Sequence, residues 1–208
     1  IANANFTSAN LSGVDLSAKD LTETILTNTD LRNANLAGAD LSNNKLVNTI
    51  LTGADLTDAI LVGADLSTTN IFGIIERINI LEKTKLIGAN LTNANLTNTN
   101  FIGADISEVI LKGADLTGAK LERAKVNNAN LEGVDLSFKN LSNIRLIDSN
   151  LTGTIFSGAN LTDANLSGAD LIDADLTGAK LIDANLTNAN LTGANFHMAD
   201  LTGANLEG

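Results

Sequence analysis

Few side chains in this sequence could do covalent chemistry. The 208 residues include one histidine, His197, and no cysteine. His197 has no serine, cysteine or metal-ligand partner at a recognisable spacing, so we expect a solvated surface side chain. Glycines recur singly, and no glycine-rich loop joins a strand to a helix to form a phosphate cradle. We therefore predict that the protein is not an enzyme and uses no cofactor and no metal.

Carboxylates are the other groups in this sequence that could bind a ligand or a metal ion. The chain holds 24 acidic and 13 basic residues, for a net charge of −11. This balance disfavours direct binding to nucleic acid or to an anionic membrane surface. Asp115 and Asp135 would stack if the fold repeats every twenty residues, and such a pair would attract cations only weakly. The nine-residue glycine-aspartate repeat of calcium-binding β-rolls is absent, so we expect a solvated acidic face.

The elements that position these groups have an unusual period. Residues 158–180 read GANLTDANLSGADLIDADLTGAK, with a leucine every five residues. Five fits neither the 3.6-residue period of a helix nor the two-residue period of a strand. We call the large apolar residue of each repeat its centre. Centres run from residue 1 to residue 206, and 41 of the 42 are Leu, Ile, Phe or Val, the exception being Glu76. Such an array indicates a repeat architecture.

Each position of the repeat has its own chemistry. The residue two before the centre, the small position, is most often Ala and points to the same side as the centre in extended backbone. The residue between them, the outward position, is mostly Asn or Asp and suits water. The two residues after the centre have turn chemistry. One extended piece and one bend take five residues, so four repeats close a square coil of twenty, and coils stack about 4.8 Å apart.

This pattern, A(D/N)LxX, resembles that of the pentapeptide repeat family over essentially the whole chain. The resemblance implies an all-β fold, a right-handed quadrilateral parallel β-helix, here a single unit over residues 1–208 with about ten four-sided coils. Centres such as Leu116, Leu136, Leu161 and Leu181 should be buried, with Ala159 and Ala179 beside them. The family is abundant in cyanobacteria, and most members have no assigned biochemical role. A minority, the fluoroquinolone-resistance proteins, mimic DNA and bind DNA gyrase.

The pattern breaks in an irregular segment at residues 72–85, which contains Glu76. Phe72, Ile75 and Ile78 in this segment would form part of a partner surface if it is a protruding loop or short helix. The alternative is a distorted coil or an excursion folded against the solenoid. Large apolar residues at outward-facing positions nearby suggest a central patch for a dimer or partner: Val47, Ile50, Ile60, Val62, Phe72, Ile80 and Ile102.

Two lysines occupy small positions. Lys19 and Lys139 lie in the matching contexts VDLSAKDL and VDLSFKNL. Because a charged side chain is costly in a dry core, we expect both to turn outward near a locally widened corner.

A twenty-residue coil allows the charges to be sorted by side. One side then holds seven acids and one base, and includes Asp15, Asp55, Asp115, Asp135 and Asp175. We predict that these five carboxylates belong to a partner surface. The sorting fails beyond residue 72 if the irregular segment adds part of a coil.

The composition gives only limited information about the cellular compartment of the protein. Hydrophobic residues make up 44% of the chain but are evenly spread, and no run approaches a membrane helix. We expect a soluble protein, with cytoplasmic, periplasmic and thylakoid-lumenal locations all open. The pattern runs to both ends without a polar cap, so we expect either caps outside this sequence or end-to-end association of chains.

Two classes of function remain. The first is a non-catalytic structural scaffold or protein–protein interaction module with an unknown partner. The second is a DNA mimic that inhibits or protects DNA gyrase.

Overall fold

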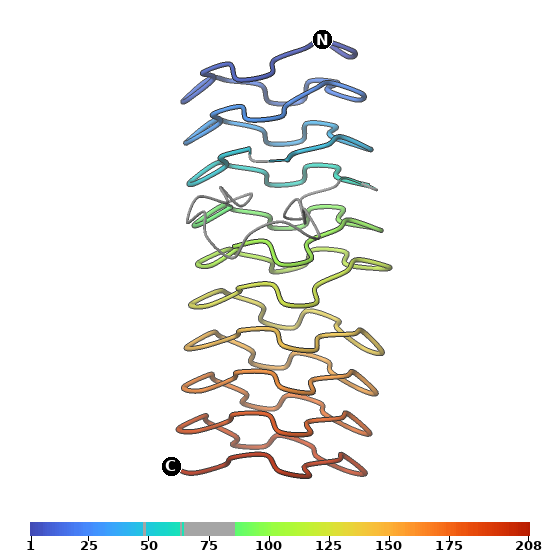
Figure 1. Ribbon diagram of the computed structural model, residues 1–208, viewed down its shortest axis with the longest axis vertical. Helices are drawn as coiled ribbons and strands as arrows, with labels where there is room; N and C mark the ends of the chain where they lie inside the picture. Colours follow the sequence, from blue (N-terminus) through green and yellow to red (C-terminus); the bar gives the residue numbers. More distant parts are fainter. Residues whose placement is uncertain (48, 63, 65–85) are drawn as a thin grey trace, which may run out of the picture.

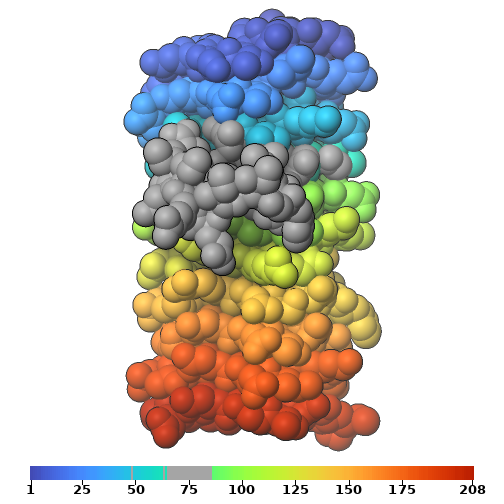
Figure 2. Space-filling view, in the orientation of Figure 1, coloured from blue at the N-terminus to red at the C-terminus, as the bar shows by residue number. Residues whose placement is uncertain are grey.

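The computed structural model describes residues 1–47, 49–62, 64 and 86–208, which form a stack of coils with the two termini at opposite ends (Figure 1). Figure 2 shows these coils packed as successive layers in chain order. The described residues contain no helix, and their β-structure consists of single bridge residues at every fifth position. Every bridge is parallel, and most join residues twenty apart, such as Asn140 with Asn160. This interval confirms the four-sided β-helix.

The bridges define four faces. The bridge residue is the outward position of each repeat, immediately before the centre. We name the faces A to D in chain order and assign each five-residue repeat to the face of its centre. Representative bridge residues are Asp20, Asp115 and Asp175 on face A, Asn100 and Asn160 on face B, Asp30 and Lys125 on face C, and Asp15 and Asp170 on face D.

The corners between faces are tight turns. At one corner, the backbone N–H of Ala164 donates to the carbonyl of Leu161 at 3.0 Å, and Asp163 between them has a φ of 57°. A positive φ at the third residue of such a turn is the mark of a type II turn. Every described residue two after a centre has a positive φ. The backbone therefore explains why Gly, Asn and Asp dominate this position, since they tolerate left-handed backbone best.

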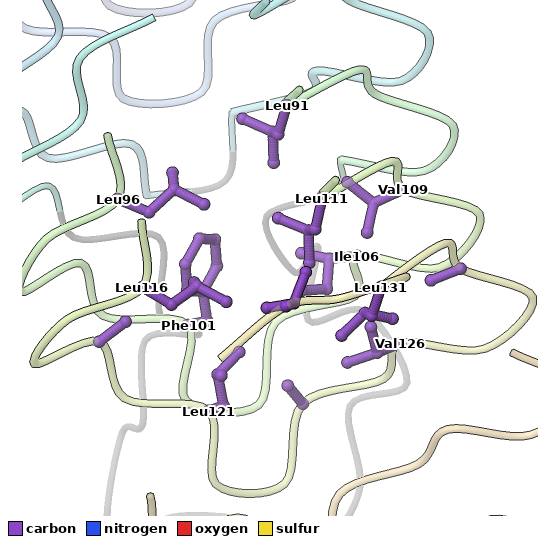
Figure 3. Close-up of a cluster of buried hydrophobic side chains, with 14 of the residues drawn as sticks. Leu91, Leu96, Phe101, Ile106, Val109, Leu111, Leu116, Leu121, Val126 and Leu131 are labelled. Carbon is purple, nitrogen blue, oxygen red and sulfur yellow. The ribbon is translucent and has the colours of Figure 1, made fainter. Parts of the chain in front are cut away.

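The core is a ladder of centres and small residues from successive coils (Figure 3). The predicted burial is confirmed: Leu116 is 2% exposed, and Leu136, Leu161 and Leu181 are 0% exposed. Ala159 and Ala179 are likewise fully buried. Most centres in the first and last coils are half-buried or exposed, because they have a neighbouring coil on one side alone.

The register changes once along the described chain. Asp55 pairs with Asn90, and Ile60 pairs with Asn95, so both bridges span 35 residues rather than twenty. The chain between Ala64 and Leu86 therefore holds 15 residues more than the square coil needs. Fifteen residues equal three sides of a coil and not a whole one. Every face assignment after this point is consequently shifted relative to a simple count of twenty.

Candidate functional site

The predicted acidic side is divided by this shift. Asp15 and Asp55 lie on face D, whereas Asp115, Asp135 and Asp175 lie on the adjacent face A. The prediction that all five share one side is therefore wrong, because the extra 15 residues move the later repeats by one face. Phe72, Ile75, Ile78 and Glu76 lie outside the described residues.

The corrected assignment still concentrates negative charge. Among the described residues, faces A and D each hold six acids and one base, while face B holds four acids and five bases and face C five acids and three bases. The acids of face A are Asp20, Glu23, Asp40, Asp115, Asp135 and Asp175, and those of face D are Asp15, Asp55, Asp58, Glu132, Asp170 and Asp173. Because faces A and D share an edge, the acidic surface covers two adjacent sides of the solenoid.

The outward aspartates also hold the turns. Oδ1 of Asp15 accepts the backbone N–H of Ser17 at 3.0 Å and its hydroxyl at 2.7 Å. Asparagine makes the same contacts elsewhere: Oδ1 of Asn185 accepts from the N–H and hydroxyl of Thr187 at 3.0 and 2.6 Å. The sequence predicts only a polar residue facing water at this position, and the structure adds the bond to the turn. Since Asn and Asp serve the turn equally, the charge of Asp is not required by the fold.

These bonds favour the ionised carboxylates. The Thr117 hydroxyl and N–H lower the pKa of Asp115, and those of Ser137 lower the pKa of Asp135. For Asp175, the hydroxyl of Ser157, which donates at 2.5 Å, lowers the pKa most, followed by that of Thr177. These three carboxylates of face A are therefore charged over the physiological pH range.

Polar residues at small positions donate to the same kind of acceptor, the backbone carbonyl of a centre in the preceding coil. The Thr49 hydroxyl donates to the carbonyl of Leu26 at 2.8 Å, and that of Thr154 donates to Leu131 at 2.9 Å. In both cases the acceptor is the centre 23 residues earlier, at the corner of the preceding coil. This is how a hydroxyl is accommodated in the core without an unpaired polar group.

Lys139 uses the same acceptor geometry. Its Nζ donates to the carbonyl of Leu116, 23 residues earlier, at 2.6 Å. The side chain is half-buried, and this burial lowers the pKa of Lys139, although Asp135 and Asp115 oppose the shift. The prediction that both lysines turn outward is confirmed for the exposed Lys19 and wrong for Lys139, because a carbonyl and two carboxylates stabilise the ammonium there.

The predicted apolar patch spreads around the solenoid. Ile60 and Val62 lie on face A, Val47 and Ile102 on face B, and Ile50 on face C. Ile60 is exposed, and the other four are half-buried. Phe72 and Ile80 lie outside the described residues. The patch therefore is not one continuous face within the part of the chain that the structure describes.

Sequence reasoning overlooked Phe138. It occupies a corner position and is 82% exposed, with a φ of 56°. The signal was present in SFKNL, where a phenylalanine stands at a position usually filled by Gly, Asn or Asp. His197, as expected, is exposed.

The described residues contain no group of three His, Cys, Asp or Glu side chains that could hold a metal ion. Within the same residues, no helix is long and apolar enough to cross a membrane.

A parallel four-sided solenoid, with a core filled by side chains and its charges on the outer faces, defines a repeat protein of the quadrilateral β-helix class. A family model described as pentapeptide repeats matches in eight copies, over residues 2–38, 34–71, 81–113, 114–138, 140–178 and 169–208. The chain belongs to the pentapeptide repeat family.

The chain is also similar to several solved structures. HetL, a pentapeptide repeat protein involved in heterocyst differentiation regulation from the cyanobacterium Nostoc sp. strain PCC 7120, is 34% identical, with 99% of this chain and 86% of HetL covered and a TM-score of 0.70. Full-length QnrB1, a plasmid-mediated fluoroquinolone resistance protein, is 21% identical, with coverages of 96% and 94% and a TM-score of 0.48. Rfr23 from the cyanobacterium Cyanothece 51142 is 26% identical, with coverages of 78% and 91% and a TM-score of 0.22. Among curated proteins, none matches the chain.

Proposed function

We propose that the chain is a non-catalytic interaction module that presents the adjacent acidic faces A and D to a protein partner. The observation that carries the proposal is the use of Asp at positions where Asn makes the same turn bonds. Together these faces hold twelve acids and two bases among the described residues. A partner with a basic surface would be steered to them and held in a defined orientation.

The shape and the relatives agree with this role. We expect one right-handed unit over residues 1–208, with about ten coils and a length of roughly 50 Å at the spacing of parallel strands. A rigid rod with regular faces suits a scaffold. The similarity to HetL, which is involved in regulation, favours a regulatory interaction and a cyanobacterial source.

The test is affinity capture with charge-neutral variants. Asp115→Asn, Asp135→Asn and Asp175→Asn together keep the turn bonds and remove three charges from face A. Proteins retained by the wild type at low salt should be lost with this variant and at high salt. A matched variant on face C, Asp30→Asn with Asp105→Asn, should retain them. Equal capture by all three proteins would contradict the proposal.

A second candidate is a DNA mimic that acts on DNA gyrase. The two acidic faces of a rod favour it, but a DNA duplex carries about one charge per 1.7 Å, or roughly 30 charges over 50 Å. The net charge of −11 is well short of that density. Inhibition of gyrase supercoiling at sub-micromolar protein, weakened in the triple Asn variant, would favour the mimic over the scaffold.

A further inference from the structure

Successive coils are joined by backbone hydrogen bonds at regular positions, and one boundary lacks more of them than any other among the described residues. This boundary, which we call the slot, runs between residues 113–121 and residues 132–140, from the end of face D across face A to the start of face B. Six backbone N–H groups there have no acceptor among the described residues: Gly113, Leu116, Gly118, Leu121, Asp135 and Asn140. One coil later the equivalent bonds are intact, since Leu136 donates to Ile155 at 2.8 Å and Leu141 to Asn160 at 2.8 Å.

The slot is hollow as well as unpaired. Two adjoining hollows of about 290 and 350 Å³ lie along it and share Gly118, Ser137 and Lys139. Asp115 and Asp135 line the first hollow, and Glu122 and Lys120 line the second. With Lys139, which lines both, the slot has three acids and two bases. The widened corner expected from the sequence is therefore present at Lys139.

Side-chain length at one column of small positions explains the opening. Thr99 bonds the Leu61 carbonyl at 2.7 Å, and the backbone bonds beside it remain, such as Phe101 to Lys120 at 2.8 Å. The longer Asn44 bonds the Leu21 carbonyl at 2.9 Å, and three backbone donors beside it lack acceptors: Glu23, Leu26 and Lys45. Lys139 has the longest side chain of the three, and six backbone donors beside it lack acceptors. Lys139 thus acts as a wedge between coils.

A strained aromatic residue stands at the end of the slot. Phe138 is mostly exposed, and its backbone is in the left-handed region. This conformation is destabilising for any residue that has a side chain. Its ring lies over Gly158, where a Cβ would approach ring atoms to 2.7 Å, so the glycine of the next coil makes room for it. The corner imposes this φ at every repeat, but at Phe138 it leaves an exposed ring at the end of the slot that is available for an apolar contact outside the chain.

We propose that the slot is the docking site for an extended basic segment of the protein partner, which pairs its main chain with the unpaired backbone groups of the two coils. This inference rests on the proposed interaction function and names the kind of partner segment. Addition of a strand to unpaired backbone is an established mode of peptide recognition. Unpaired N–H groups in a sheet favour it, because pairing removes their desolvation cost.

The charges and the strand period define the segment. Side chains of an extended peptide alternate between opposite directions. Asp115 and Asp135 are exposed outward positions on either side of the slot, so they suit Lys or Arg on the outer side of the segment. Leu116 and Leu136 are buried in the core of the same two coils and leave little free space beside the slot, so only a small apolar residue suits the inner side. Alternating basic and apolar residues meet both requirements.

A labelled synthetic peptide tests this directly. The probe is a fluorescein-labelled peptide of about six residues that alternates Lys and Val, and fluorescence anisotropy measures its binding. Its comparisons are the Glu and Val peptide and the Lys and Val peptide with N-methyl groups on alternate amides. The first peptide should bind, the acidic one should not, and N-methylation should weaken binding at least about tenfold because it removes donors. Equal binding of the N-methylated peptide, or no binding of any peptide, would overturn the proposal.

Lys139→Ala separates the slot from simple charge attraction. The substitution removes a positive charge, so attraction alone would strengthen binding, whereas closure of the slot should abolish it. Lys19→Ala, in the matching sequence context, removes the same charge elsewhere and should leave binding unchanged. Hydrogen exchange should show the six amides protected in Lys139→Ala and in the wild type with peptide, but not in the free wild type. If captured partners depend on faces A and D yet bind Lys139→Ala normally, the slot is wrong and the proposed function stands.

Discussion

Lys139→Ala should stabilise the protein. Alanine is the commonest residue at small positions, and it would let the two coils close. Closure restores six backbone hydrogen bonds, each worth about 0.5–1 kcal/mol net, or about 3–6 kcal/mol together. The lost bond from the ammonium to the Leu116 carbonyl offsets about 1.5–3 kcal/mol. The midpoints of the two ranges leave a net gain of about 2 kcal/mol, which corresponds to a Tm about 4–8 °C higher for a domain of this size.

Urea unfolding followed by far-UV circular dichroism measures the change in the free energy of unfolding. Lys19→Ala is the matched control, and since Lys19 is exposed its effect should stay within about 0.5 kcal/mol. Amide hydrogen exchange identifies where the gain arises. The claim that Lys139 holds the two coils apart would be refuted if the variant were no more stable than the wild type. It would also be refuted if the six amides still exchanged freely in the variant.

Four further predictions follow from the core, the corners and the carboxylates. Leu136→Asp should unfold neighbouring coils, because an unpaired charge enters a dry core, and loss of the β spectrum would show it. Phe138→Gly should raise the free energy of unfolding by about 1 kcal/mol in urea melts, because its φ of 56° favours glycine. Asn in place of Asp115, Asp135 and Asp175 should leave Tm nearly unchanged, whereas Ala at the same positions should lower it by removing the turn bonds. The pKa of each of these carboxyls is lowered below 3.8 in the folded state, so their stabilisation is present above that pH and is lost as the pH falls through the lowered values. Unfolding measured across acid pH should therefore show a shallower dependence in the triple Asn variant.

The fold could be predicted from the sequence because its five-residue frame is continuous. A large apolar residue at every fifth position, with a small residue two before it, leaves few backbones that bury both. The corner residues added independent support, since Asp163 and Gly158 occupy left-handed turn positions that the sequence pattern had already identified as bends. The burial of Leu136 and Ala159 followed directly.

The placement of the acidic residues could not be predicted in the same way. Ten, fifteen or twenty extra residues all preserve a five-residue frame, and only the pairing of Asp55 with Asn90 shows that fifteen were added. The slot could not be predicted from the sequence either, although Lys139 at a small position indicated where the core pattern changes. Its side chain was expected to turn outward, but the ammonium instead donates to the carbonyl of Leu116 at the corner of the preceding coil.

Asn and Asp accept the same hydrogen bond at the turns, and this equivalence has an evolutionary consequence. Codons for these two residues differ by a single base, so each outward position can gain or lose a negative charge in one mutational step. Because Oδ1 accepts the same N–H in either residue, as at Asp15 and Asn185, that step leaves the turn intact. The solenoid can therefore change the electrostatic potential of one face at a time under selection for a new partner, without first acquiring compensating mutations in its core.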